Sequence, residues 1–122
     1  MQNIKFSDNW PKLENRAVGD DLTTIRWYDK IDYYMRLREE DVRLIVVGFD
    51  RYIATIKRVY LSKMKDLTDE FIKADTRPTM TRENFYDMME NWYGRKPDWK
   101  DWDSLVVVIH LKIVEVLDVG SN

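Results

Sequence analysis

The chain has no cysteine and only one histidine, and this composition limits the catalytic and metal-binding sites that it can form. Without cysteine, neither a disulfide framework nor a thiolate nucleophile can form. A zinc site takes three or four histidine, cysteine or carboxylate ligands, whereas His110 stands alone in an apolar segment. We therefore expect no metal and no other cofactor, with His110 packed or partly exposed within a strand.

Long apolar runs and glycine-rich loops are also missing. The longest wholly apolar run, Leu105 to Ile109, is far shorter than the roughly 20 residues of a membrane span. The four glycines are isolated, which excludes a phosphate-binding loop, and none of the four serines lies in a nucleophile elbow. The polar segment 1–10 does not resemble a secretion signal. We expect a soluble, cytoplasmic protein that does not associate with membranes.

The chain also carries little net charge. The formal net charge is only -2, although 34% of the residues are charged. The chain thus lacks the overall positive field that attracts duplex DNA or RNA, and any nucleic-acid contact must be local. Its 122 residues fit a single domain spanning 1–122, which we expect to be a monomer or a weak homodimer.

A predicted hairpin from Val42 to Tyr60 organises the fold. An apolar run is followed by the turn Gly48-Phe49-Asp50, after which β-branched and aromatic residues resume. Alternation along the second strand defines two sets, Tyr52, Ala54, Ile56 and Tyr60 on one face and Ile53, Thr55, Lys57 and Val59 on the other. Because both faces are mainly apolar, we predict that this strand belongs to the wall of a small barrel.

Further elements flank this hairpin. We predict a short opening strand near Ile4 and Phe6, a short helix from Trp10 to Gly19, a strand from Leu22 to Trp27 and a last strand from Leu105 to Leu117. Two helices precede the last strand. The first starts at Asp66 or Thr68 and buries Leu67 and Phe71, with Ile72 as a further candidate. The second is capped by Thr81, buries Phe85, Met88, Met89 and Trp92, and ends at Gly94. This order predicts an α+β domain.

Aromatic and basic residues form two further groups with open interpretations. Trp27, Tyr28, Tyr33 and Tyr34 lie near Arg26 and either stack unpaired bases or fill the core. Lys57, Arg58, Lys63 and Lys65 form either one wall of a local anion site or a solvated edge. Trp92, Trp99 and Trp102 are expected to anchor the helical insert and its loop on the barrel, and Trp99 and Trp102, if exposed, would instead indicate protein contacts.

The stretch Gly19 to Arg26 is the most informative. Thr24 and Arg26 are two residues apart on one strand face, so they offer a hydroxyl and a bidentate cation to a phosphate, carbonyl or base edge. We expect both groups to lie at the edge of a solvent-filled hollow.

With the hairpin, the helical insert and the last strand, this stretch resembles the ASCH domain family of the PUA-like superfamily, and in particular its short stand-alone archaeal members. The matching pieces are Gly48 to Val59, Leu67 to Thr76, Glu83 to Gly94 and Trp102 to Leu117. The resemblance implies a small PUA-like β-barrel of about five to six strands, with a short N-terminal helix and a two-helix insert before the last strand. It also implies a cleft beside the Thr-Ile-Arg strand.

The family is associated with RNA binding and, in some bacterial members, with amide hydrolysis of N4-acetylcytidine. The hydrolytic members use a lysine just after the glycine, the second threonine and a later acidic residue. By resemblance the threonine maps to Thr24, but Asp21 occupies the lysine position. Lys57 or Lys30 is then the candidate substitute, and Asp75 is the candidate acidic residue.

Three functions follow as hypotheses. The first is a module that binds single-stranded RNA or a nucleoside-like ligand through Thr23, Thr24, Arg26, Trp27 and Lys57. The alternative is a hydrolase acting on modified nucleosides or RNA, with Thr24, Lys57 and Asp75 as catalytic residues. A third possibility is a structural domain that works through protein contacts.

Overall fold

A computed structural model describes residues 3–5, 17–27, 34, 36–47, 50–75 and 80–118. Its elements are β1 (Asn3–Lys5), β2 (Asp21–Trp27), β3 (Val42–Val47), β4 (Asp50–Lys63), η2 (Met64–Asp66), α2 (Asp69–Asp75), α3 (Arg82–Tyr93), η3 (Asp101–Asp103) and β5 (Leu105–Asp118). Most of the predicted N-terminal helix, residues 10–16, lies outside the described residues. The hairpin, the strand after Gly19, the helical pair and the last strand are all present as predicted.

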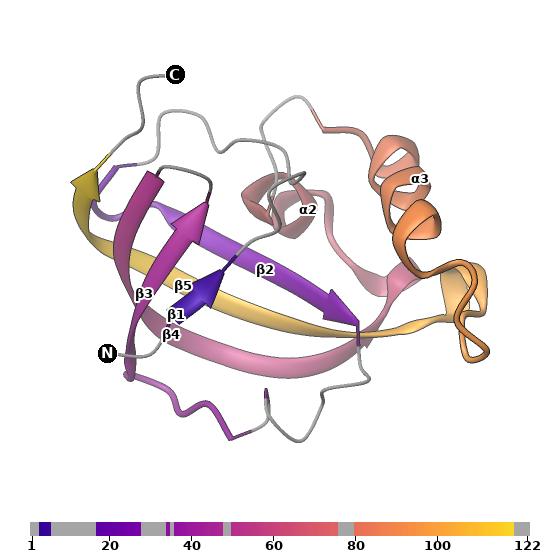
Figure 1. The fold of residues 1–122 in the computed structure, drawn as a ribbon, viewed down its shortest axis with the longest axis horizontal. Helices are drawn as coiled ribbons and strands as arrows, with labels where there is room; N and C mark the ends of the chain where they lie inside the picture. The colour runs from indigo at the N-terminus through magenta and orange to yellow at the C-terminus, as the bar shows by residue number, and fades with distance from the viewer. Residues whose placement is uncertain are drawn as a thin grey trace.

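The strands form one curled sheet in the order β1-β3-β4-β5-β2 (Figure 1). Four of them, β3, β4, β5 and β2, are antiparallel and make a half-barrel, while the three-residue β1 joins β3 in parallel at one edge. Our prediction of a barrel of about five to six strands was therefore wrong, because four strands make the curled wall and this wall is a half-barrel. Strand β1 is too short to cover the length of β2 at the opposite edge, so among the described strands the sheet stays open.

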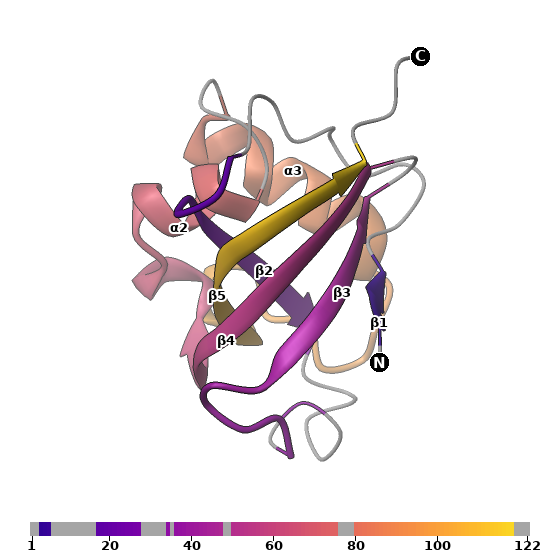
Figure 2. The ribbon, with the colours of Figure 1, turned by 90° about the vertical axis from the view of Figure 1, so that its left-hand side faces the viewer.

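The two faces of the sheet carry separate hydrophobic cores. Ile4 from one edge strand and Leu22 from the other belong to the same core, which shows that the sheet curls around it. We call this side the inner face; its core also contains Ile45, Tyr52, Ala54, Ile56, Val107, Ile109 and Leu111. The other side, the helix face, is covered by α2 and α3 (Figure 2). Its core contains Ile25, Met64, Leu67, Ile72, Phe85, Met89, Val106 and Val108.

A β-bulge at Lys57 corrects our assignment of faces along β4. Ile56 pairs with Leu111 and Arg58 pairs with the adjacent His110, so Lys57 is an extra residue in the ladder. Before the bulge the prediction holds, since Ile56 lies in the inner core. After it the prediction is wrong, because Val59 packs on the inner core and Tyr60 on the helix-face core. Bulges bend a strand and increase its twist, and two further register shifts in the same ladder contribute to the curl.

Side-chain caps define the starts of both helices. The Thr68 hydroxyl accepts a hydrogen bond from the Phe71 amide at 3.2 Å, and the Thr81 hydroxyl accepts one from the Asn84 amide at 3.1 Å. The predicted cap at Thr81 is thus confirmed. Phe85 is buried as predicted, but Trp92 is 37% exposed rather than covered.

Among the helices in the described ranges, none has the length and apolar character needed to cross a bilayer.

Candidate functional site

Thr24 and Arg26 form a hydrogen-bonded pair on the inner face of β2. Arg26 Nε donates to Thr24 Oγ1 at 2.7 Å. Thr24 is only 1% exposed, whereas Arg26 is partly exposed. We expected both groups at the edge of a hollow, and this expectation was wrong for the threonine, because the sheet buries its hydroxyl beneath the arginine. The arrangement makes Thr24 a group that orients the guanidinium, rather than one presented to solvent.

Thr23 lies on the helix face, away from this pair. It is 0% exposed and is opposite His110 in the β2–β5 ladder. Its Oγ1 is buried and has no hydrogen-bond partner among the residues that the structure describes. The placement separates Thr23 from Thr24 and Arg26, with which we had grouped it as a binding residue.

Lys57 is directed toward the β3 side of the sheet. Its Nζ lies 3.1 Å and 3.3 Å from the two carboxylate oxygens of Glu40, in the turn before β3. Strand β5 separates β4 from β2, so this ion pair draws Lys57 away from the threonine–arginine pair. Lys57 is therefore not brought together with Thr24 as the predicted site requires.

The remaining predicted residues are only partly described. Asp75 ends α2 and Trp27 ends β2, but their side chains lie outside the described residues. Lys30 lies outside them altogether.

His110 is a partly exposed strand residue, as predicted. Its Nε2 lies 3.2 Å from Asp21 Oδ1, and its ring is 5.8 Å from that of Phe71. Within the described ranges, no three histidine or acidic residues are grouped in a way that could hold a metal ion.

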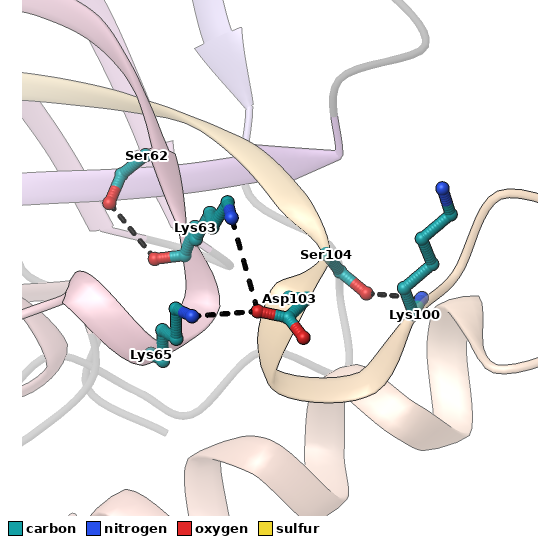
Figure 3. A network of polar contacts seen from close by, with 6 residues as sticks. All are labelled: Ser62, Lys63, Lys65, Lys100, Asp103 and Ser104. Carbon is teal, nitrogen blue, oxygen red and sulfur yellow. Dashed lines mark hydrogen bonds and ion pairs between the residues drawn. The ribbon is translucent and has the colours of Figure 1, made fainter.

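A cavity of about 340 Å³ lies at the end of the β4–β5 ladder. Its lining consists of Lys63, Asp98, Lys100, Asp103 and Leu105. Asp103 Oδ1 lies 2.9 Å from Lys65 Nζ and 4.0 Å from Lys63 Nζ (Figure 3). The hydrogen bond from Lys65 lowers the pKa of Asp103, and the same bond raises the pKa of Lys65, so both groups stay charged near neutral pH.

The loop that supplies Lys100 and Asp103 is fixed from within. The Lys100 amide donates to Ser104 Oγ at 2.6 Å, and Ser104 is 1% exposed. The Ser104 carbonyl in turn accepts from the Met64 amide at 2.9 Å. The loop is thereby tied both to itself and to the segment that follows β4.

Aromatic side chains anchor the same loop on α3. The Tyr86 ring stacks on Trp102 with centroids 4.6 Å apart, and the Tyr86 hydroxyl donates to Asp101 Oδ1 at 2.8 Å. Trp99 Nε1 donates to the Glu90 carboxylate. Both tryptophans pack against the helix-face core, which confirms their predicted anchoring role.

The cavity and Arg26 lie at the same end of the inner face. Arg26 pairs with Val107, which in turn pairs with Leu61, and the next inner-face pair is Lys63 with Leu105. Leu61 and Leu105 are 42% and 40% exposed, so an apolar strip lies between the arginine and the cavity. We call Arg26, Leu61, Lys63 and Leu105 the open end of the inner face.

The sequence predicted only some of the charged residues at and beside the cavity. Of the predicted basic wall, Lys63 and Lys65 meet at Asp103, but Lys57 binds Glu40 and the Arg58 guanidinium lies 4.5 Å from the Tyr60 ring centroid. Asp98, Lys100 and Asp103 were missed, because polar residues in a loop give no local signal of the strand end against which they fold.

The fold is that of a small barrel-like α+β protein, a curled antiparallel half-barrel with two helices on one face. No protein-family model matches the sequence, and no curated protein matches it. Among solved structures, protein EF3133 from Enterococcus faecalis V583, described as belonging to DUF984, is similar, with a TM-score of 0.54 and 16% sequence identity. The similarity covers 78% of this chain and 61% of that one. At this identity the likeness concerns the fold alone.

Proposed function

We propose that this chain is an ASCH-type binding module that recognises single-stranded RNA or a nucleotide-like ligand at the open end of the inner face. The hydrogen bond of 2.7 Å from Arg26 to the buried Thr24 carries the proposal. It holds a partly exposed guanidinium in one orientation before any ligand arrives. Immobilising a long side chain on binding costs about 0.5–1.5 kcal/mol, and an arginine that is already oriented avoids part of that cost.

The surroundings of Arg26 fit this ligand class. Guanidinium groups bind phosphates and base edges in a bidentate manner. The exposed Leu61 and Leu105 side chains offer apolar contact to a base or sugar, which a single strand can present because its bases are unstacked. With a net charge of -2, the protein depends on such local contacts instead of on bulk attraction to a polyanion.

The contacts of the predicted catalytic residues favour binding over hydrolysis. The Thr24 hydroxyl accepts the Arg26 hydrogen bond, and the Lys57 ammonium is held by Glu40. A hydrolase based on these residues needs a base within hydrogen-bond reach of the threonine, and Lys57 is directed toward β3 instead.

The proposal is tested by titrating a fluorescent single-stranded oligouridylate and following its anisotropy at low salt. Arg26→Ala should weaken binding about tenfold and lower the salt dependence by the equivalent of about one phosphate contact. Arg58→Ala is the matched control, because it removes the same charge from the helix face of a nearby strand. We expect it to change affinity less than about twofold.

Equal losses for the two variants, or no binding by the wild-type protein at low salt, would contradict the proposal. Thermal unfolding of both variants verifies that the comparison is made between folded proteins.

A further inference from the structure

We infer that the cavity lined by Lys63 and Lys100 is a subsite for a terminal phosphate monoester, carried either by a mononucleotide or by the 5′ end of an RNA strand. The inference rests on the proposed function in that the rest of such a ligand lies along the open end of the inner face toward Arg26. It adds a specificity that Arg26 alone does not provide, the distinction between a strand that ends in phosphate and one that ends in hydroxyl.

The charges around the cavity favour an anion. The cavity lining contains two ammonium groups, those of Lys63 and Lys100, and two carboxylates, those of Asp98 and Asp103, while Lys65 lies outside the lining and binds Asp103. Asp103 is matched chiefly by Lys65 at 2.9 Å, whereas Lys63 stands at 4.0 Å, the outer limit of an ion pair. Figure 3 shows the Lys100 ammonium directed away from Asp103. Two of the three lysines are thus placed to redirect toward an incoming anion at little cost.

A phosphate monoester suits this lining better than a diester does. A monoester carries a charge of about -1.5 to -2 at neutral pH and three strongly accepting terminal oxygens. A diester carries about one charge and offers fewer such oxygens, so it gains less from several lysines while it is still repelled by Asp103. At about 340 Å³ the cavity is at the small end of the range of ligand sites, about 300–1,000 Å³. That size suits a chain end rather than the interior of a long strand.

The register connects the cavity to Arg26. Lys63 and Leu105 form a pair that borders the cavity, and Leu61 lies one inner-face step further along, opposite Val107 and then Arg26. The strands that carry Lys63 and Arg26 are separated by one strand, hence by about 10 Å across the sheet. A short nucleotide chain can therefore place its end phosphate in the cavity, its sugar and base over the two leucines, and its next phosphate near Arg26.

The loop that carries Lys100 and Asp103 is also preorganised. Asp101, between Lys100 and Trp102, has a φ of 54°, a left-handed conformation that is uncommon outside glycine. The hydrogen bond from Tyr86 and the stacking on Trp102 hold it there. Strained backbone of this kind persists only where the surrounding contacts determine it, and it concentrates at ligand sites.

The test compares one oligouridylate in two forms, with a 5′ phosphate and with a 5′ hydroxyl. The wild-type protein should bind the phosphorylated form about three- to tenfold more tightly. Lys63→Ala should abolish that preference. Lys112→Ala is the matched control, since this exposed lysine lies near the middle of β5, opposite Asp21 at the start of β2 and away from the cavity, and it should leave the preference unchanged. Asp103→Asn should increase the preference, because it removes the carboxylate that competes for the lysines.

The two proposals fail in different ways. Arg26→Ala should weaken both forms equally and keep the preference for phosphate. If neither oligouridylate binds but uridine monophosphate does, and Lys63→Ala abolishes that binding, the subsite stands and the RNA-binding function falls. Equal affinity of the wild-type protein for the two forms, equal effects of Lys63→Ala and Lys112→Ala, or a weaker preference in Asp103→Asn would each overturn the subsite.

Discussion

The helix face and the inner face of the sheet are both well packed at their centres but differ at their ends. On the helix face, Ile72 of α2 and Phe85 and Met89 of α3 are each at most 1% exposed, because they pack in the core between the helices and the sheet. On the inner face, packing stops at the open end, where Leu61 and Leu105 are 42% and 40% exposed beside Arg26. This difference is the basis for assigning stability to the helix face and for proposing ligand binding at the open end of the inner face.

The largest expected effect is a loss of stability when a buried side chain on the helix face is truncated. Phe85→Ala removes a buried ring from the helix-face core and should lower the free energy of unfolding by about 3–5 kcal/mol. The affinity of the folded fraction for RNA should stay unchanged. Denaturant unfolding and anisotropy titration measure the two quantities.

The matched truncation on the inner face is Leu61→Ala. Because Leu61 is largely exposed, its loss should cost less than about 1 kcal/mol of stability, yet weaken RNA binding several-fold. If Phe85→Ala and Leu61→Ala reduce affinity alike, the division between a structural and a binding face is wrong.

Thr24→Val tests the contribution of a single hydroxyl on the inner face. The substitution keeps the shape but removes the acceptor for Arg26 Nε, so unfolding should become easier by about 1 kcal/mol. RNA affinity should fall too, because the guanidinium loses its fixed orientation. An unchanged affinity would show that Arg26 needs no support from Thr24.

The same substitution at the neighbouring position, Thr23→Val, should have the opposite effect on stability. Thr23 Oγ1 is buried without a hydrogen-bond partner among the described residues, so Thr23→Val replaces an unsatisfied polar atom with a methyl group. Stability should rise by up to about 1 kcal/mol, and RNA affinity should not change. A loss of stability comparable to that in Thr24→Val would mean that the Thr23 hydroxyl is bonded after all.

The smallest effect concerns the anchor of the cavity loop. The hydrogen bond to Asp101, together with desolvation, raises the pKa of Tyr86 from 10.0 to about 12. A group whose pKa is raised on folding adds stability below its unfolded pKa, and this stability is lost as pH increases through the folded value. Between about pH 10 and pH 12, the wild-type protein should therefore lose slightly more stability than Tyr86→Phe. Thermal unfolding across that range checks the difference, and parallel curves would contradict it.

Local signals made part of this fold predictable. The hairpin around Gly48 and the helix after Thr81 follow from turn, alternation and capping rules that act over a few residues. The bulge at Lys57 does not, because apolar residues occupy both faces of β4 and alternation then fixes no register. Closure of the barrel depends on how the two edge strands meet, which is a property of the whole chain.

The candidate site was predictable only to the same extent. The pairing of Thr24 with Arg26 follows from their spacing on one strand, but the burial of Thr24 is decided by the curl of the sheet. The basic residues Lys63 and Lys65 were visible in the sequence, whereas their meeting point, Asp103, comes from a distant loop. No pattern in the sequence around these residues indicates that contact.

The most direct test of the account is a methyl NMR titration of the wild-type protein with single-stranded RNA. The methyl signals of Leu61 and Leu105, at the open end of the inner face, should shift as RNA is added. Those of Ile72 in α2 and Met89 in α3, buried in the helix-face core, should stay in place. Shifts concentrated on Ile72 and Met89, or spread evenly over both faces, would contradict the assignment of ligand binding to the inner face.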